Sequence, residues 1–166
     1  MVIQMATDER VSPLHIARTT LAAVVSLVVA RVLRMPEPYW ATITTIVVMQ
    51  STLGGAWKAS RQRFAGTAMG AVAGGLAASY FGPNLLAYAV AIAATGFVCL
   101  ALHLDRTAYR FSGITIAIVM LIAHPQSAWV IAVHRFVEVS LGIAVALILS
   151  AAWPERLPVA PVSGNP

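Results

Sequence analysis

The sequence predicts an all-α fold, a polytopic membrane protein of six transmembrane helices, and three observations support this prediction. The chain of 166 residues is 59% hydrophobic and only 10% charged, whereas a soluble domain carries about 25% charged residues. Its apolar residues form separate runs of about 15 to 25, the length that crosses a bilayer. Each run ends at a charged residue or at a helix-breaking Pro or Gly.

The predicted spans cover residues 14–33, 39–56, 64–81, 85–102, 109–123 and 128–152. They form one transmembrane domain, residues 1–153, and the Pro-rich tail, residues 154–166, is expected to be disordered and cytoplasmic. The four tryptophans fall at predicted span ends, where amphipathic rings prefer to lie. These features predict direct contact with the lipid bilayer.

The distribution of basic residues predicts the orientation in the membrane. With the N-terminus inside, the inner sections hold Arg10, Arg18, Lys58, Arg61, Arg63, Arg106, Arg110 and Arg156, and the outer sections hold only Arg31, Arg34 and Arg135. The positive-inside rule therefore predicts that both termini are cytoplasmic. We expect a multi-pass protein of the inner (cytoplasmic) membrane. The basic residues are scattered singly among apolar runs, which argues against nucleic-acid binding.

Two stretches resemble each other at an offset of about 72 residues. Each has Arg-Phe with a Gly six residues after the Phe, and the copies are Arg63-Phe64 to Gly70 and Arg135-Phe136 to Gly142. Just upstream, Thr44 recurs as Thr115 at an offset of 71. Because each half holds three spans, the second half enters from the opposite side, which defines two inverted three-helix repeats. Chance similarity between apolar stretches is the alternative.

Spans 39–56 and 109–123 are the short or interrupted segments that mark a substrate site in an inverted repeat. The first is interrupted at Gly54-Gly55 and carries Thr44, and the second carries Thr115. These hydroxyls could bind a polar solute. Alternatively, they bond their own helix or a neighbouring one.

Glycines spaced by four residues predict close helix packing, because a helix without Cβ atoms on one face admits another backbone. Gly66, Gly70 and Gly74 form such a row, and Gly142 begins a weaker row of small residues in span 128–152. Spans 64–81 and 128–152 are therefore expected to cross near the axis that relates the repeats.

Arg135 lies inside an apolar span, where a charge costs about 2.5–3.5 kcal/mol unless it faces water or a partner. Glu138 lies three residues further on the same helix face, so a structural salt bridge is one interpretation. The functional interpretation is that Arg63 and Arg135 form a positive path for an anion. Arg63 could instead reach lipid phosphate at the membrane surface.

Glu138 and His134 are the candidates for proton coupling, since a carboxylate beside an arginine or a histidine can load and release a proton. No metal-ligand cluster, P-loop or catalytic constellation is present in the sequence. We therefore expect no metal, no cofactor and no enzyme activity, and any transport is passive or driven by an ion gradient.

Three segments carry a family resemblance: Tyr39-Trp-Ala-Thr-Ile-Thr, Gln50-Ser-Thr-Leu-Gly54 and Arg61-Gln-Arg-Phe-Ala-Gly-Thr-Ala-Met-Gly70. With them the chain resembles the fusaric acid resistance (FUSC) family of aromatic acid exporters over nearly all six spans. It also looks distantly like the aluminium-activated malate transporters of plants, which conduct anions. The resemblance implies an anion-handling pore and points to Arg63, Gly66, Thr67 and Arg135.

The resemblance predicts a transporter or channel for small organic anions, with efflux of aromatic carboxylic acids as its activity. The family pattern often has two six-helix units, whereas this chain has one. We therefore expect a homodimer or an assembly with another membrane unit. The alternative is a non-transporting membrane subunit or scaffold of a larger assembly.

Overall fold

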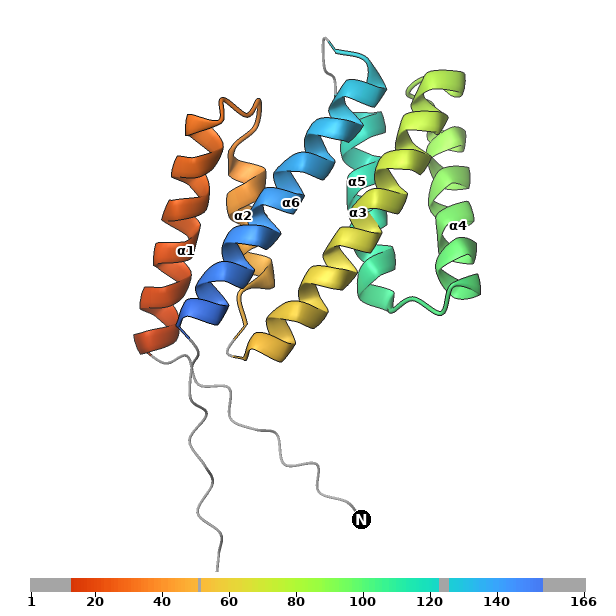
Figure 1. Ribbon diagram of the computed structural model, residues 1–166. Helices are drawn as coiled ribbons and strands as arrows, with labels where there is room; N and C mark the ends of the chain where they lie inside the picture. Colours follow the sequence, from red (N-terminus) through yellow and green to blue (C-terminus); the bar gives the residue numbers. More distant parts are fainter. Residues whose placement is uncertain (1–12, 51, 123–125, 154–166) are drawn as a thin grey trace, which may run out of the picture.

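The computed structural model describes residues 13–50, 52–122 and 126–153, and all regular structure in these ranges is α-helical. The helices are α1 (Pro13–Val32), α2 (Tyr39–Val48), α3 (Leu53–Phe81), α4 (Leu85–Ala101), α5 (Arg106–Leu121) and α6 (Ala128–Ala152). They alternate in direction, so the start of α1 and the end of α6 lie at the same end of the bundle (Figure 1). The all-α prediction is confirmed, whereas the expected tail, residues 154–166, lies outside the described residues.

Three helices, α1, α3 and α6, are long and apolar enough to cross a membrane. The helices α2 and α4 are apolar but shorter. With its 10 residues, α2 is about 15 Å long, half the thickness of a bilayer core. The bundle therefore combines full-length spans with short helices.

The boundary between α2 and α3 differs from the sequence prediction. The helix α2 ends at Val48, before Ala56, and α3 begins at Leu53, before Phe64. Thr52 explains the early start, because its side chain caps α3 by accepting a hydrogen bond from the Gly55 N–H at 3.1 Å. The pair Gly54-Gly55 thus lies in the first turn of α3, and the chain is interrupted just before it.

The helices α3 and α6 lie side by side at the centre of the bundle (Figure 1). Figure 1 shows α1 and α2 beside α6, and α4 and α5 beside α3, and the contacts between elements follow the same arrangement. The ring of Phe64 on α3 contacts the ring of Phe136 on α6, with their centroids 4.9 Å apart. The last helix of each half therefore packs on the first two helices of the other half.

Glycines allow the closest of these helix contacts. A Cβ atom at Gly70 would lie 2.5 Å from the Ser112 carbonyl oxygen, and one at Gly142 would lie 2.3 Å from the Ala41 carbonyl oxygen. The predicted glycine row of α3 thus faces α5, and Gly142 of α6 faces α2. The two rows do not face each other.

Polar and apolar side chains are distributed in the opposite way from a soluble domain. The largest fully buried side chains include Arg18 and Glu138, together with several Thr and Ser residues. Large apolar side chains such as Leu85, Phe97 and Leu100 lie on the outside. Charged residues are almost never buried in soluble proteins unless they are paired. This distribution fits a bundle whose solvent is lipid.

Candidate functional site

Several buried charged side chains lie on α3 and α6, the two helices at the centre of the bundle. Arg63 of α3 is 5% exposed, and Arg135 and Glu138 of α6 are 2% and 1% exposed. We call this group the polar centre, and it comprises Glu37, Trp40, Thr44, Arg63, Phe111, Arg135 and Glu138. Since buried charges in a membrane are costly, such a group is a candidate functional site.

Two carboxylates surround Arg135. It forms ion pairs with Glu37 and with Glu138, the latter at 3.3 Å. Glu138 Oε1 also accepts a hydrogen bond from the Glu37 N–H at 3.0 Å, and the Tyr39 hydroxyl donates to Glu37 Oε1 at 2.8 Å. The guanidinium lies over the Trp40 ring, 4.4 Å from its centroid. Arg135 therefore holds the connection between α1 and α2 against α6.

Within the described part of the chain, no carboxylate pairs with Arg63 in this way. Its Nη2 donates to Thr44 Oγ1 at 3.1 Å, and its guanidinium lies 4.3 Å from the centroid of Phe111. Its buried Nε has no hydrogen-bond partner among the residues that the structure describes. Among the described residues, the ion pairs of the polar centre involve Arg135 and not Arg63. Arg63 is thus a buried cation with a hydroxyl and an aromatic ring for neighbours.

The surroundings of the two arginines correspond to the offsets found in the sequence. Trp40, which lies against Arg135, matches Phe111, which lies against Arg63, at an offset of 71 residues. Trp40 and Thr44 are one helical turn apart on the same face of α2. Because one contacts Arg135 and the other contacts Arg63, a single face of α2 brings the two arginines together. The structure thus places both predicted anion-path arginines in one centre.

The other predicted site residues lie at the edge of this centre or outside it. Thr67 is buried on α3, one turn after Arg63. The Thr115 hydroxyl donates to the Phe111 carbonyl of its own helix at 3.0 Å, as the alternative interpretation of the span threonines predicted. His134 is half-buried beside Arg135, and no interaction among the described residues joins it to the polar centre.

Sequence reasoning missed two functional-site candidates, Glu37 and Arg18. Glu37 lies between Pro36 and Pro38 and was interpreted as part of a connection. Arg18 counted only as an inner-side charge, yet it is 1% exposed and donates to the carbonyls of Trp153, at 2.8 Å, and of Gln50. Arg18 belongs to the buried row of α1, whose other members are Ala22, Ser26 and Ala30, and this spacing of four was the available signal.

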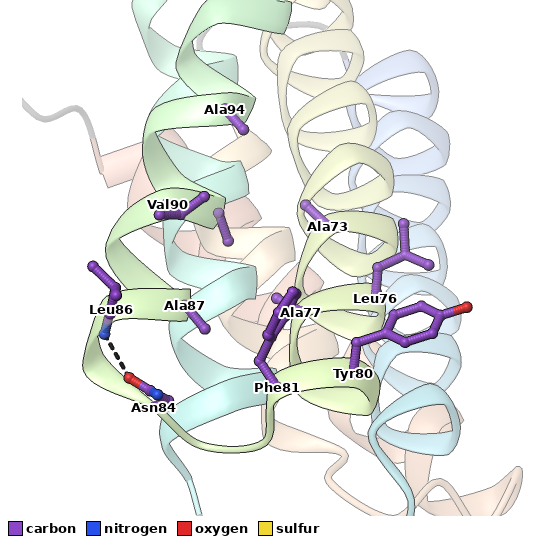
Figure 2. A pocket seen from close by; sticks show the side chains of 11 residues that line it. Ala73, Leu76, Ala77, Tyr80, Phe81, Asn84, Leu86, Ala87, Val90 and Ala94 are labelled. Atoms are coloured by element: carbon purple, nitrogen blue, oxygen red, sulfur yellow. Dashed lines mark hydrogen bonds between the residues drawn. The ribbon is translucent and has the colours of Figure 1, made fainter.

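A separate groove lies between α3 and α4, away from the charged residues. Its volume is about 420 Å³, and Ala73, Ala77 and Phe81 of α3 face Ala87 and Val90 of α4 across it (Figure 2). The side chains around it are almost all apolar. A second hollow of about 440 Å³ continues along the same two helices. This outward-facing groove offers no charged group to a polar solute.

The membrane-length helices, the apolar exterior and the buried charges together define a polytopic membrane protein. Within the described residues, no group of three or more His, Cys, Asp or Glu side chains could hold a metal ion. The polar centre is therefore a set of cations, carboxylates, hydroxyls and aromatic rings.

Comparison with known proteins gives the family. The model of the family described as "Fusaric acid resistance protein-like" (FUSC_2) matches residues 21–149, so the chain belongs to this family, as the resemblance predicted. The chain is 30% identical over 146 residues to the inner membrane protein YeeA of Escherichia coli (strain K12), which covers 86% of this chain and 41% of YeeA. It is 34% identical over 135 residues to the uncharacterized transporter YdhK of the same strain, which covers 76% of this chain and 20% of YdhK.

The chain thus spans less than half of the length of these two relatives. No solved structure gives a significant match.

Proposed function

We propose that this chain is the membrane unit of a transporter or channel for small organic anions, with Arg63 as the residue that binds the anion. The observation that carries the proposal is a buried guanidinium without an acidic partner among the described residues. One relative in the same family is described as a transporter. A guanidinium without an acidic partner in direct contact can pair with the carboxylate of a substrate instead.

The surroundings of Arg63 favour an aromatic carboxylic acid. A guanidinium binds a carboxylate in bidentate fashion, and the unpartnered Nε is one of the donors for that geometry. The Thr44 hydroxyl adds a polar contact, and the Phe111 ring offers an apolar face beside the charge. Thr67 and Thr115 supply further hydroxyls along the path, and Arg135 forms its second positive position. Export from the cytoplasm is the proposed direction.

The proposed topology is six membrane crossings in two inverted three-helix repeats, with both termini in the cytoplasm and the chain in an inner membrane. Three matched contacts support the repeat: Arg63 on Phe111 with Arg135 on Trp40, Gly70 on Ser112 with Gly142 on Ala41, and Phe64 on Phe136. In the first two pairs, the residues of one contact match those of the other at an offset of 71 or 72 residues. In the third, Phe64 and Phe136 match each other at an offset of 72. The name of the relative YeeA supports the inner membrane.

The proposed assembly is a homodimer or a pairing with another membrane unit. Its support is the family pattern, in which two six-helix units often occur together. Glu138 and His134 are the proposed proton-coupling residues of the transporter, and no enzyme activity is proposed. The alternative function is a non-transporting membrane subunit or scaffold, which the extensive pairing of Arg135 favours.

Anion flux into proteoliposomes tests the proposal. We expect the wild-type chain to carry benzoate, and Arg63→Gln to reduce the flux at least tenfold, because the charged hydrogen bonds to the carboxylate are lost. Arg61→Gln is the matched control, since it removes the same charge from an exposed position on α3. Equal flux in the Arg63→Gln variant would overturn the assignment of the anion site to Arg63. No flux of benzoate or malate in the wild type would favour the scaffold.

A further inference from the structure

We infer that the polar centre binds an anion and a proton together, with the proton on Glu138, so that each anion crosses the membrane with a proton in the same direction. Export is then driven by the concentration gradient of the anion itself. This inference rests on the proposed function. It adds that the binding of the anion favours the binding of the proton and does not oppose it. Sequence reasoning named Glu138 and His134 as candidates without choosing between joint binding and exchange. The geometry of the charges makes that choice.

The charges of the polar centre balance before any anion binds. Its two guanidinium groups belong to Arg63 and Arg135, and its two carboxylates belong to Glu37 and Glu138. An anion at Arg63 therefore leaves one negative charge in excess inside the membrane, which is costly. A proton on one carboxylate restores neutrality. Anion and proton then favour each other, whereas exchange would require them to exclude each other.

Glu138 can take this proton without breaking the centre. Arg135 keeps its ion pair with Glu37 when Glu138 becomes neutral. The Glu138 Oε1 can still accept the Glu37 N–H bond when the proton lies on Oε2. Glu138 is also the more buried carboxyl, since its side chain is 1% exposed and that of Glu37 is 27% exposed. Burial favours the neutral form of a carboxyl group.

The other charged and titratable groups on the elements around Glu138 do not remove this imbalance. On its own helix, Arg135 pairs with it and His134 precedes the pair. Tyr39 of α2 bonds Glu37, and Arg63 of α3 is the anion site itself. The remaining groups on α1, on the connection from α1 to α2 and on α5 are exposed or lie near the opposite end of α6. They are His15, Arg18, Arg31, Arg34, Arg106, Tyr109 and Arg110.

The coupling is large enough to measure. The anion site and Glu138 are separated by roughly one to two helical turns, about 10 Å, since α2 carries the contacts of both arginines. Two unit charges at about 10 Å and an effective dielectric constant of about 20 change each other's binding roughly tenfold. Linkage requires the same factor for both ligands, so a proton on Glu138 raises the anion affinity roughly tenfold.

Titration calorimetry with benzoate on the purified chain tests the inference. Measurements in two buffers of different ionisation heat give the number of protons taken up per bound benzoate. We expect the wild type to take up part of a proton in the pH range in which Glu138 titrates, and its benzoate affinity to rise roughly tenfold as the pH falls through that range. Glu138→Gln abolishes the uptake and holds the affinity constant, because the amide has the shape of the protonated acid.

Glu37→Gln gives a different signature from Glu138→Gln. Glu138 is then the only carboxylate on Arg135 among the described residues, so it binds a proton less readily and the uptake moves to lower pH.

Benzoate binding without proton uptake, or with proton release, overturns the inference and leaves the Arg63 site standing. Uptake that persists in Glu138→Gln and vanishes in His134→Gln overturns the assignment to Glu138. If neither benzoate nor malate binds, the proposed function fails as well.

Discussion

Arg63 and Arg135 occupy matching positions in the two halves of the chain, yet they differ in the polar groups that contact their guanidinium groups. Each guanidinium lies over an aromatic ring, at 4.3 Å from Phe111 and 4.4 Å from Trp40. Arg135 pairs with two carboxylates, whereas the described residues give Arg63 only the Thr44 hydroxyl as a polar partner. Among the described residues, the fold thus holds one arginine in ion pairs and one arginine without an acidic partner in contact. Under the proposed function, the difference separates the residue that holds helices together from the residue that binds the anion.

The sequence positions that match the two acids explain this difference. At the offset of 71 to 72 residues, the counterpart of Glu37 is Ala108 and that of Glu138 is Gly66. Both counterparts lie at the contact of α3 with α5, where a Cβ at Gly66 would be 2.3 Å from the Ala108 carbonyl oxygen. The place that holds carboxylates around Arg135 is therefore filled by close backbone packing beside Arg63.

The largest expected effect comes from removing each arginine in turn. Arg135→Met leaves two buried or half-buried carboxylates without their counter-charge and should destabilise the fold by about 3–5 kcal/mol. Arg63→Met removes a buried cation that makes no ion pair among the described residues and should change stability by about 1 kcal/mol or less. Thermal unfolding of both variants in the same detergent gives the comparison.

A rescue experiment identifies the cause of the Arg135 effect. Glu37→Gln and Glu138→Gln, added to Arg135→Met, should restore most of the lost stability, since no unpaired carboxylate then remains at this position. If Arg63→Met destabilises the fold as much as Arg135→Met does, both arginines are structural and the contrast between them is wrong.

The second expected effect tests how alike the two halves are. Gly70→Ala and Gly142→Ala each place a Cβ within 2.5 Å of a backbone oxygen on the facing helix, and each should cost about 1–3 kcal/mol. Gly113→Ala is the matched control, because nothing lies within 4 Å of its Cβ and alanine is the better helix former. Unfolding temperatures measure all three. A loss confined to one half would argue against equivalent crossings.

The sequence predicted the helices better than their ends. Apolar runs and breakers located all six helices, because the length and polarity of each run are local properties. The residues 57–61 were expected to form a connection on account of their charges and lie inside α3. The chain interruption depends instead on the Thr52 cap, a side-chain hydrogen bond that hydropathy does not measure.

The candidate site was predictable in part for a similar reason. Arg63, Arg135 and the Arg135–Glu138 pair follow from local spacing and from the repeat. Glu37 lies 101 residues from Glu138 in the chain, and the bond between them depends on the packing of α2 on α6. Arg18 bonds the Trp153 carbonyl across 135 residues. A periodic pattern within one segment cannot predict contacts between residues that are so far apart in the chain.

The smallest expected effect distinguishes the two matched threonines. Thr44→Val removes the only hydroxyl that Arg63 contacts among the described residues, and benzoate affinity should fall about fivefold, which corresponds to a hydrogen bond of about 1 kcal/mol. Thr115→Val should cost less, because that hydroxyl bonds a carbonyl of its own helix. Calorimetric titration of both variants measures the ratio. Equal losses would mean that the second threonine also reaches the ligand, and the anion path would then extend into the half that contains Thr115.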